Sequence, residues 1–188
     1  MTDPDQPGPA KLTTARRIVV YGVTGSGKTT LARRIGERTG LPWHSVDDLT
    51  WEPGWVEVPL AVQRDRIAAI CAGDAWVLDS AYLSWADIPL ARADLIVGLD
   101  LSRPLLLYRL VTRTLIRGIV RTPICNGNTE SLREALSRDS IVLVQFRSLP
   151  RKRARLRAWQ ADPAMPPVVL LRSARAVRAW LHTLSGTT

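Results

Sequence analysis

The sequence predicts an α/β fold in which a five-stranded parallel sheet is covered by helices on both faces, which makes three layers. Short apolar runs rich in β-branched residues alternate along the chain with segments whose apolar residues recur at helical spacing. Parallel strands need helical crossovers, and strands buried on both faces are apolar along most of their length. The five strands are expected at residues 18–21, 42–48, 75–79, 95–100 and 168–171.

The intervals between these runs carry the signals of helices. The first, 29–39, has apolar residues at helical spacing and is followed by Gly40, a residue typical of helix ends. Further helices are expected at 59–71, at 103–117, from the capping box of Ser131 and Glu134 to 149, and at 173–184. Pro150 is expected to interrupt the chain after the fourth of these segments, because proline breaks helices.

The stretch between the first strand and the first helix is a phosphate-binding motif. It reads Gly22-Val23-Thr24-Gly25-Ser26-Gly27-Lys28-Thr29, the G-x-x-x-x-G-K-T pattern of the P-loop. An ordinary glycine-rich turn is the alternative, but the order strand, loop and helix favours the P-loop, whose backbone N–H groups point at phosphate oxygens. Lys28 is expected to reach the β- and γ-phosphates, and Thr29 to hold Mg²⁺. Thr30 closes the predicted nucleotide-binding segment of a P-loop NTPase fold.

Two strands end in acidic residues that suit the metal. Residues 75–79 end in Asp79 and residues 95–100 in Asp100, and an acid after an apolar strand is the Walker B pattern. We expect Asp79 to hold Mg²⁺, since strands next to the P-loop strand matter most, and Asp100 to cap the following helix. The second strand ends in Asp47 and Asp48, where ligands bind in parallel sheets. Asp47 is the candidate base for an acceptor hydroxyl, and Asp48 is better explained as a helix cap.

Arginines are the other candidate phosphate ligands. Arg109, Arg113 and Arg117 are spaced by four and therefore share one face of the helix at 103–117. They can be solvated surface residues, but a phosphate partner would convert their mutual repulsion into binding energy, and we favour that role for Arg109 and Arg113. The densest basic run, 151–157, is better explained as a solvated helix face.

Bulk properties place the chain among soluble globular proteins. The 188 residues suit one domain at 15–188, with a lid at about 114–138 and an acceptor-binding insertion after the second strand. Residues 1–14 are proline-rich and acidic, and are expected to be a disordered leader rather than a signal peptide. No apolar run has the length of a membrane span, and Cys71 and Cys125 lack metal-site spacing. The cytoplasm is the expected compartment.

The motifs together resemble a known family. Residues 46–51 (Val-Asp-Asp-Leu-Thr-Trp), 76–82 (Trp-Val-Leu-Asp-Ser-Ala-Tyr) and 91–94 (Ala-Arg-Ala-Asp), taken with the P-loop, are similar to the adenylate-kinase-related P-loop proteins known as topology modulation proteins. The resemblance covers residues 17–155. It implies a nucleoside-monophosphate-kinase fold with a lid, and it implies that Arg109 and Arg113 are the paired arginines before that lid. It also places Arg92 as an acceptor-phosphate arginine.

Two functions from different classes follow from these observations. The first is a kinase that transfers the γ-phosphate of Mg-ATP to a small acceptor, using Lys28, Asp47, Arg109 and Arg113 as its catalytic residues. The second is a nucleotide-dependent regulatory or nucleic-acid-binding module, which the net charge of +9 and the run at 151–157 would serve. We favour the kinase, because no aromatic stacking platform or recognition helix accompanies the charge.

Overall fold

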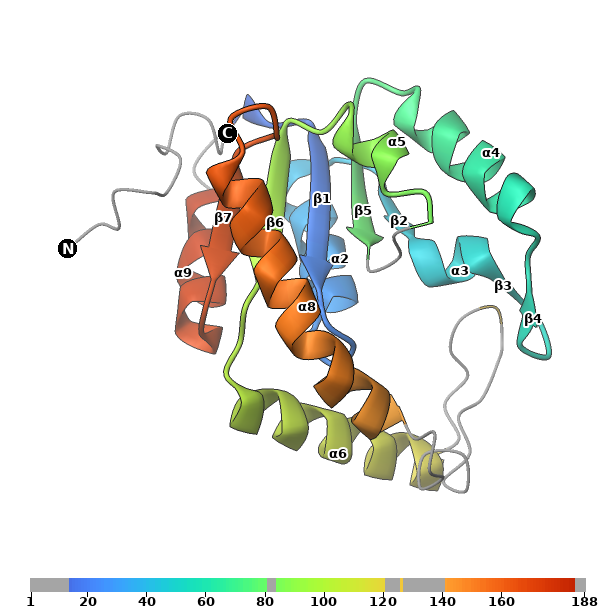
Figure 1. Cartoon of the computed structure of the whole chain (residues 1–188), viewed down its shortest axis with the longest axis vertical. Coiled ribbons are helices and arrows are strands. Elements are labelled where there is room, and N and C mark those ends of the chain that lie inside the picture. Colours follow the sequence, from blue (N-terminus) through green and yellow to red (C-terminus); the bar gives the residue numbers. More distant parts are fainter. Residues whose placement is uncertain (1–13, 81–83, 121–125, 127–140, 185–188) are drawn as a thin grey trace.

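The centre of the protein is a parallel sheet, as the sequence predicts. The computed structural model describes residues 14–80, 84–120, 126 and 141–184, and only the backbone of 80, 114, 115, 117–120 and 141–147. The strands lie in the order β2 (Trp43–Ser45), β5 (Trp76–Ser80), β1 (Arg17–Gly22), β6 (Leu95–Leu99) and β7 (Val168–Leu171), and all four pairings are parallel (Figure 1). The P-loop strand β1 is therefore central, with β5 and β6 as its neighbours.

Helices cover both faces of this sheet, and β1 shows why. Ile18 and Val20 pack into one apolar cluster with α2 (Lys28–Thr39) and α9 (Ala174–Thr183). Val19 and Tyr21 pack on the opposite face with α4 (Leu60–Cys71) and α8 (Ile141–Ala161). Alternate side chains of a strand point to opposite faces, so an apolar run must be covered twice. The three-layer α/β prediction is confirmed.

A third apolar cluster lies beyond the carboxyl end of the sheet. Helix α6 (Arg103–Val120) runs across this end, and α8 descends to meet it (Figure 1). Val23 of the P-loop packs there with Leu101, with Leu106 of α6 and with Leu149 of α8. These contacts fix both helices against the P-loop, which brings their polar side chains to the same place.

Both of these helices are longer than the sequence suggests. Helix α6 continues past Gly118 to Val120, where a loop is expected, because a single glycine costs a helix interior only about 1 kcal/mol. Helix α8 passes through Pro150, which is expected to interrupt it. The neighbouring Leu149 is 3% exposed within the third cluster, and this packing holds the helix on both sides of the missing N–H.

The segment after β2 also differs from its prediction. The strand stops at Ser45, and 46–50 form the short helix α3 (Val46–Thr50) instead of the end of a strand. Asp47 and Asp48 lie in its first turn, where acidic side chains favour a helix. A hairpin of β3 (Trp51–Glu52) and β4 (Val56–Glu57) follows, and α5 (Asp87–Leu90) follows β5; none of these three elements is expected from the sequence.

Other predictions concern residues that the structure does not describe. The leader at 1–14, apart from Thr14, and the lid at 114–138, apart from 114–120 and Asn126, lie outside the described residues, as does the capping box of Ser131 and Glu134. Within the part of the chain that is described, no helix combines the length and the apolar character needed to cross a membrane.

Candidate nucleotide-binding site

The P-loop adopts the strand, loop and helix order that its motif requires. Strand β1 ends at Gly22, and α2 begins at Lys28. Gly25 and Gly27 have φ angles of 75° and 89°, in the left-handed region that residues with a Cβ rarely adopt. Because Gly27 is the N-cap of α2 and carries no side chain, the first N–H groups of the helix stay available to an anion.

The buried hydroxyl of Ser26 is a second indication that this loop binds a polar ligand. Its side chain is 1% exposed, and its Oγ has no hydrogen-bond partner among the described residues. Buried hydroxyls are almost always hydrogen-bonded, so an orphaned one at the heart of a glycine loop calls for an explanation. A phosphate oxygen in the loop would supply the missing acceptor.

Arg109 of α6 reaches this loop directly. Its Nη1 donates to the backbone carbonyl oxygen of Ser26 over 2.9 Å. A Cβ placed on Gly27 would lie only 3.4 Å from the same Nη1 atom, so the arginine lies against the turn into α2. The side chain is therefore not a solvated surface group, which was the alternative explanation of its spacing with Arg113.

Lys28 lies at the centre of a group of charges from four elements. Burial lowers the pKa of Lys28, the nearby carboxylates of Asp47 and Asp79 raise it, and Arg113 lowers it further. The pKa of Lys28 is lowered overall, so the nearby carboxylates do not fully offset the cost of burying its charge. The structure thus brings together Lys28, Asp47, Asp79 and Arg113, which the sequence proposes as site residues. The side chain of Arg117 is not among those described.

Asp79 is held beside the P-loop on the adjacent strand. Burial raises its pKa and Asp47 adds to this, while hydrogen bonds from the Thr29 hydroxyl and the Val46 N–H, together with the charge of Lys28, lower it. The net result is a raised pKa for a carboxylate only 3% exposed. Its Oδ1 accepts the Val46 N–H over 2.9 Å. One hydroxyl and one carboxylate side by side are the donor set that suits Mg²⁺ shared with phosphates.

The described part of the chain holds no metal cage made of protein ligands alone. Among the described residues, no three His, Cys, Asp or Glu side chains gather as a metal-binding group. Mg²⁺ commonly takes one or two protein ligands and completes its shell with phosphate oxygens and water, so Thr29 and Asp79 fit that ion.

Asp100, the other candidate metal ligand, already forms an ion pair with an arginine. Both β5 and β6 adjoin β1, so adjacency to the P-loop strand does not separate Asp79 from Asp100, contrary to our reasoning from the sequence. The separation comes from partners: Arg153 of α8 donates from Nε to Asp100 Oδ1 over 2.6 Å. Asp100 also precedes α6 by three residues without joining it. It anchors α8 to the carboxyl end of β6.

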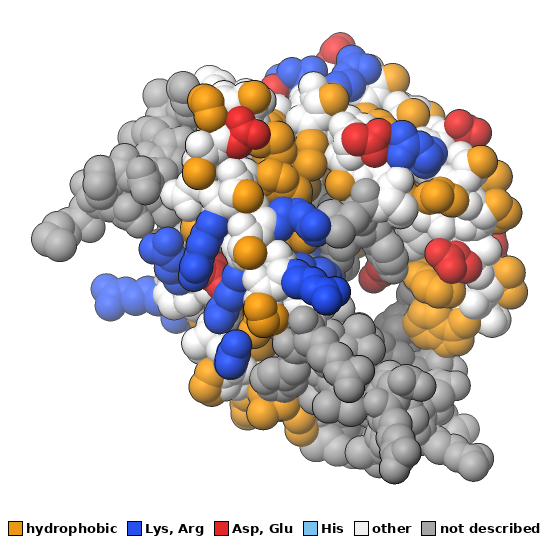
Figure 2. All heavy atoms as spheres, in the orientation of Figure 1, with side chains coloured by type: hydrophobic (Ala, Val, Ile, Leu, Met, Phe, Trp, Pro, Cys, Tyr) orange, Lys and Arg blue, Asp and Glu red, His pale blue; other side chains and the backbone are white. Residues whose placement is uncertain are grey.

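The basic run at 151–157 is not simply a solvated helix face. Arg151 and Arg157 are exposed, but Lys152, Arg153 and Arg155 are half-buried and Leu156 is buried. Figure 2 shows Lys and Arg side chains gathered on the face where α8 lies. The charge of Lys28 helps to lower the pKa of Lys152, so the two lysines lie within electrostatic reach of each other. Lys152 is not among the site residues that the sequence predicts.

Helix α3 brings Asp47 to this group of charges, and the β3–β4 hairpin follows it along the chain. Asp47 lies on α3 within electrostatic reach of Lys28 and Asp79. Trp51 and Trp55 meet edge to face with their ring centroids 5.8 Å apart, and Trp55 is 40% exposed. Asn126 Nδ2 donates to the backbone carbonyl oxygens of Asp48 at 2.9 Å and Trp51 at 2.7 Å. These contacts join Asn126 to α3 and to the hairpin.

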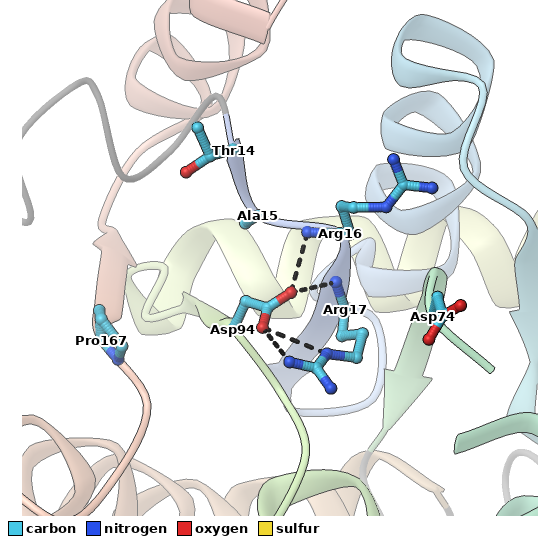
Figure 3. Close-up of a pocket in the computed structure, with 7 residues that line it drawn as sticks. All are labelled: Thr14, Ala15, Arg16, Arg17, Asp74, Asp94 and Pro167. Carbon is cyan, nitrogen blue, oxygen red and sulfur yellow. Dashed lines mark hydrogen bonds and ion pairs between the residues drawn. The ribbon is translucent and has the colours of Figure 1, made fainter. Parts of the chain in front are cut away.

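Arg92 is not part of this group. It is exposed and precedes β6 by three residues, at the amino end of the sheet, where its charge acts on Cys71. The same end holds a pocket lined by Arg16, Arg17 and Asp94, among others (Figure 3). Because the P-loop follows the carboxyl end of β1, the expectation that Arg92 binds an acceptor phosphate is wrong.

Comparison with known proteins identifies the fold. No protein-family model and no curated protein matches the sequence. Among solved structures, a gluconokinase from Sinorhizobium meliloti 1021 is similar with a TM-score of 0.53 at 22% identity, covering 90% of this chain and 91% of that one. Shikimate kinase from Acinetobacter baumannii in complex with shikimate is similar with a TM-score of 0.54 at 17% identity, over 94% and 95% of the two chains.

A third similarity agrees with these two. Shikimate kinase from Bacteroides thetaiotaomicron has a TM-score of 0.53 at 13% identity, over 91% of this chain and 97% of that one. The chain has the fold of the P-loop kinases. In all three comparisons the similarity extends over nearly the whole length of both chains.

Proposed function

We propose that the protein is a kinase of the adenylate-kinase-related, topology modulation type, which transfers the γ-phosphate of Mg-ATP to a small-molecule acceptor. The observation that carries this proposal is the meeting of Lys28, Thr29 and Asp79 at the carboxyl ends of two adjacent strands. Each of the three supplies a different requirement of phosphoryl transfer: a cation for the phosphates, a hydroxyl for the metal and a carboxylate for the metal.

The remaining residues would act by position and charge. The N–H groups of 22–30 would bind the phosphates, and Arg109 and Arg113 would offset the charge that spreads over the transferred group. Arg109 also stiffens the loop through its bond to the Ser26 carbonyl oxygen. ATP supplies the phosphoryl group, and the protein supplies alignment and a preorganised positive field.

Asp47 would act on the acceptor. A hydroxyl nucleophile needs a base within about 2.6–3.2 Å of its oxygen, and Asp47 is the carboxylate near Lys28 that is not needed for the metal. Trp51 and Trp55 stand on the same side of the site, where their rings could line the acceptor pocket.

The test is ATP- and Mg²⁺-dependent phosphorylation of an acceptor library. It would contain hydroxylated carboxylic acids, shikimate among them, together with sugars, nucleosides and nucleoside monophosphates. We expect ADP production above background with at least one acceptor and a phosphorylated product by mass spectrometry. The Lys28→Met variant should lose this activity, whereas Arg157→Met, which removes an exposed charge, should retain it. ADP production that no acceptor stimulates would contradict the proposal, even if ATP binds.

A further inference from the structure

The inner face of α8 is directed at the P-loop and the sheet. Leu149 packs against Val23, and Leu156 packs against β6 and β7 so closely that a Cβ on Gly98 would lie 2.7 Å from Leu156 Cδ2. Residues 149, 152 and 156 are spaced by three and four, so they share one side of a helix. Lys152 therefore lies on the packed side of α8, between two buried leucines.

A second contact fixes the helix beside Lys152. The adjacent Arg153 donates from Nε to Asp100 Oδ1 over 2.6 Å and from Nη2 to the Leu101 carbonyl oxygen over 2.7 Å. Two bonds from one planar guanidinium hold both the position and the rotation of α8. The Lys152 side chain is thereby held over the carboxyl end of the sheet.

The charges around Lys152 are those of the candidate site. Lys28 of α2, Arg155 of α8 and Asp47 of α3 all act on its ammonium. Burial, Lys28 and Arg155 lower the pKa of Lys152 and Asp47 raises it, and the net value is about 8. A second lysine is thus held near the P-loop lysine with only Asp47 as the compensating charge among these groups.

The residue type is unusual for this chain. Only three lysines, Lys11, Lys28 and Lys152, are present among 26 basic residues, and two of them meet at the same site. Arginine carries a broad, planar, always charged group, whereas lysine presents a compact charge that suits a single phosphate oxygen.

Resting on the proposed function, we propose that Lys152 is a second lysine ligand for the terminal phosphate of the bound nucleotide, on the side of that phosphate that faces the acceptor. Lys28 and Asp47 are its neighbours, one assigned to the donor phosphates and the other to the acceptor hydroxyl. The transferred group passes between donor and acceptor, so an ammonium near both meets that group rather than the base or the ribose.

The test compares two nucleotides that differ by one phosphate. A non-hydrolysable ATP analogue and ADP, each with Mg²⁺, are titrated calorimetrically into the full chain at pH 7, for the unaltered protein, Lys152→Met and Arg157→Met. Arg157 lies on the exposed side of the same helix, so its variant loses the same formal charge away from the site. A second variant, Lys152→Gln, retains a polar side chain, and thermal unfolding shows that each variant is folded.

Removing Lys152 should weaken the ATP analogue by roughly 10- to 100-fold, the range for a lost hydrogen bond between charged groups, and weaken ADP by less than about threefold. Arg157→Met should change neither. Equal loss for both nucleotides, or no loss, would overturn the assignment of Lys152 and leave the nucleotide site in place. Failure of the unaltered chain to bind either nucleotide would overturn the nucleotide site and the role of Lys152 together.

Discussion

Acidic and basic side chains gather at both ends of the central sheet, but they are well paired at the amino end and incompletely compensated at the carboxyl end. At the amino end, Asp94 Oδ2 accepts the N–H groups of Arg16 at 3.0 Å and Arg17 at 2.8 Å, and its Oδ1 accepts Nη2 of Arg17 at 2.6 Å (Figure 3). Burial raises the pKa of Asp94, but these hydrogen bonds outweigh it and the pKa is lowered. The fold therefore stabilises the ionised form of Asp94 more than water does.

At the carboxyl end the balance is reversed. The pKa of Asp79 is raised, and the pKa values of Lys28 and Lys152 are lowered, in each case with burial as the largest cause. These groups are held close together without full compensation, which costs stability. Charges that a fold keeps at such a cost are typical of sites that bind something, and well-paired charges are typical of structural supports.

The largest effect we expect is on turnover, from Asp47→Asn. The amide keeps the shape of the side chain and removes the base, so ATP affinity should change little while turnover of a hydroxyl acceptor falls by roughly 10²- to 10⁴-fold. Steady-state kinetics measure this, with Asp48→Asn, the exposed neighbouring acid, as the matched control. Turnover that survives the loss of the Asp47 carboxylate would rule out its role as base and point to an acceptor that needs none, such as a phosphate.

A smaller effect, on stability alone, is expected at the amino end. Asp94→Asn removes the acceptor charge of Arg17, and we expect the free energy of unfolding to fall by about 1–3 kcal/mol, since both side chains are partly exposed. Urea unfolding monitored by tryptophan fluorescence measures it. Asp87→Asn, which breaks the more exposed pair with Arg64, should cost less than Asp94→Asn does. Weakened nucleotide affinity in Asp94→Asn would break the contrast between the two ends.

The smallest expected effect is a pH dependence of stability that comes from Lys152. Its pKa is about 8 in the folded protein against 10.5 ordinarily, so between these pH values the unfolded chain binds more protons. Stability from this group therefore rises with pH across that window, and at pH 7 the charged side chain destabilises the fold. Lys152→Met should raise the free energy of unfolding at pH 7 by about 1–2 kcal/mol and flatten the rise.

Urea unfolding at pH 7, 8, 9 and 10 on both proteins tests this dependence. Burial raises the pKa of Cys71 to about 11, which lowers stability at high pH, but Cys71 is present in both proteins and its contribution cancels in the difference. A difference that stays constant with pH would show that Lys152 is well solvated.

The strands and the P-loop could be predicted because their signals are local. A short apolar run bounded by turn residues favours a doubly covered strand, and β7 lies at its predicted bounds. The short α3 and the passage of α8 through Pro150 could not be predicted in the same way. Both depend on packing with distant segments, such as Leu149 against Val23.

The residues of the candidate site also differ in whether local signals are enough to predict them. Lys28, Thr29 and Asp79 follow from motifs, whereas the choice of Asp79 over Asp100 required the partner Arg153. Lys152 was hidden inside a run of arginines whose composition suggests a solvated face. Its spacing from Leu149 and Leu156 was the one available signal, and that signal becomes useful only if the helix continues past the proline.

The most direct test of the central claim is the affinity and stability of Lys28→Met measured together. Calorimetry with a non-hydrolysable ATP analogue and Mg²⁺ should give binding to the unaltered chain and a loss of at least about 100-fold in the variant, because a charge-assisted phosphate contact disappears. The unfolding temperature of the variant should be unchanged or higher, since an incompletely compensated charge has been removed. A variant that keeps its nucleotide affinity but unfolds at a lower temperature would contradict the account.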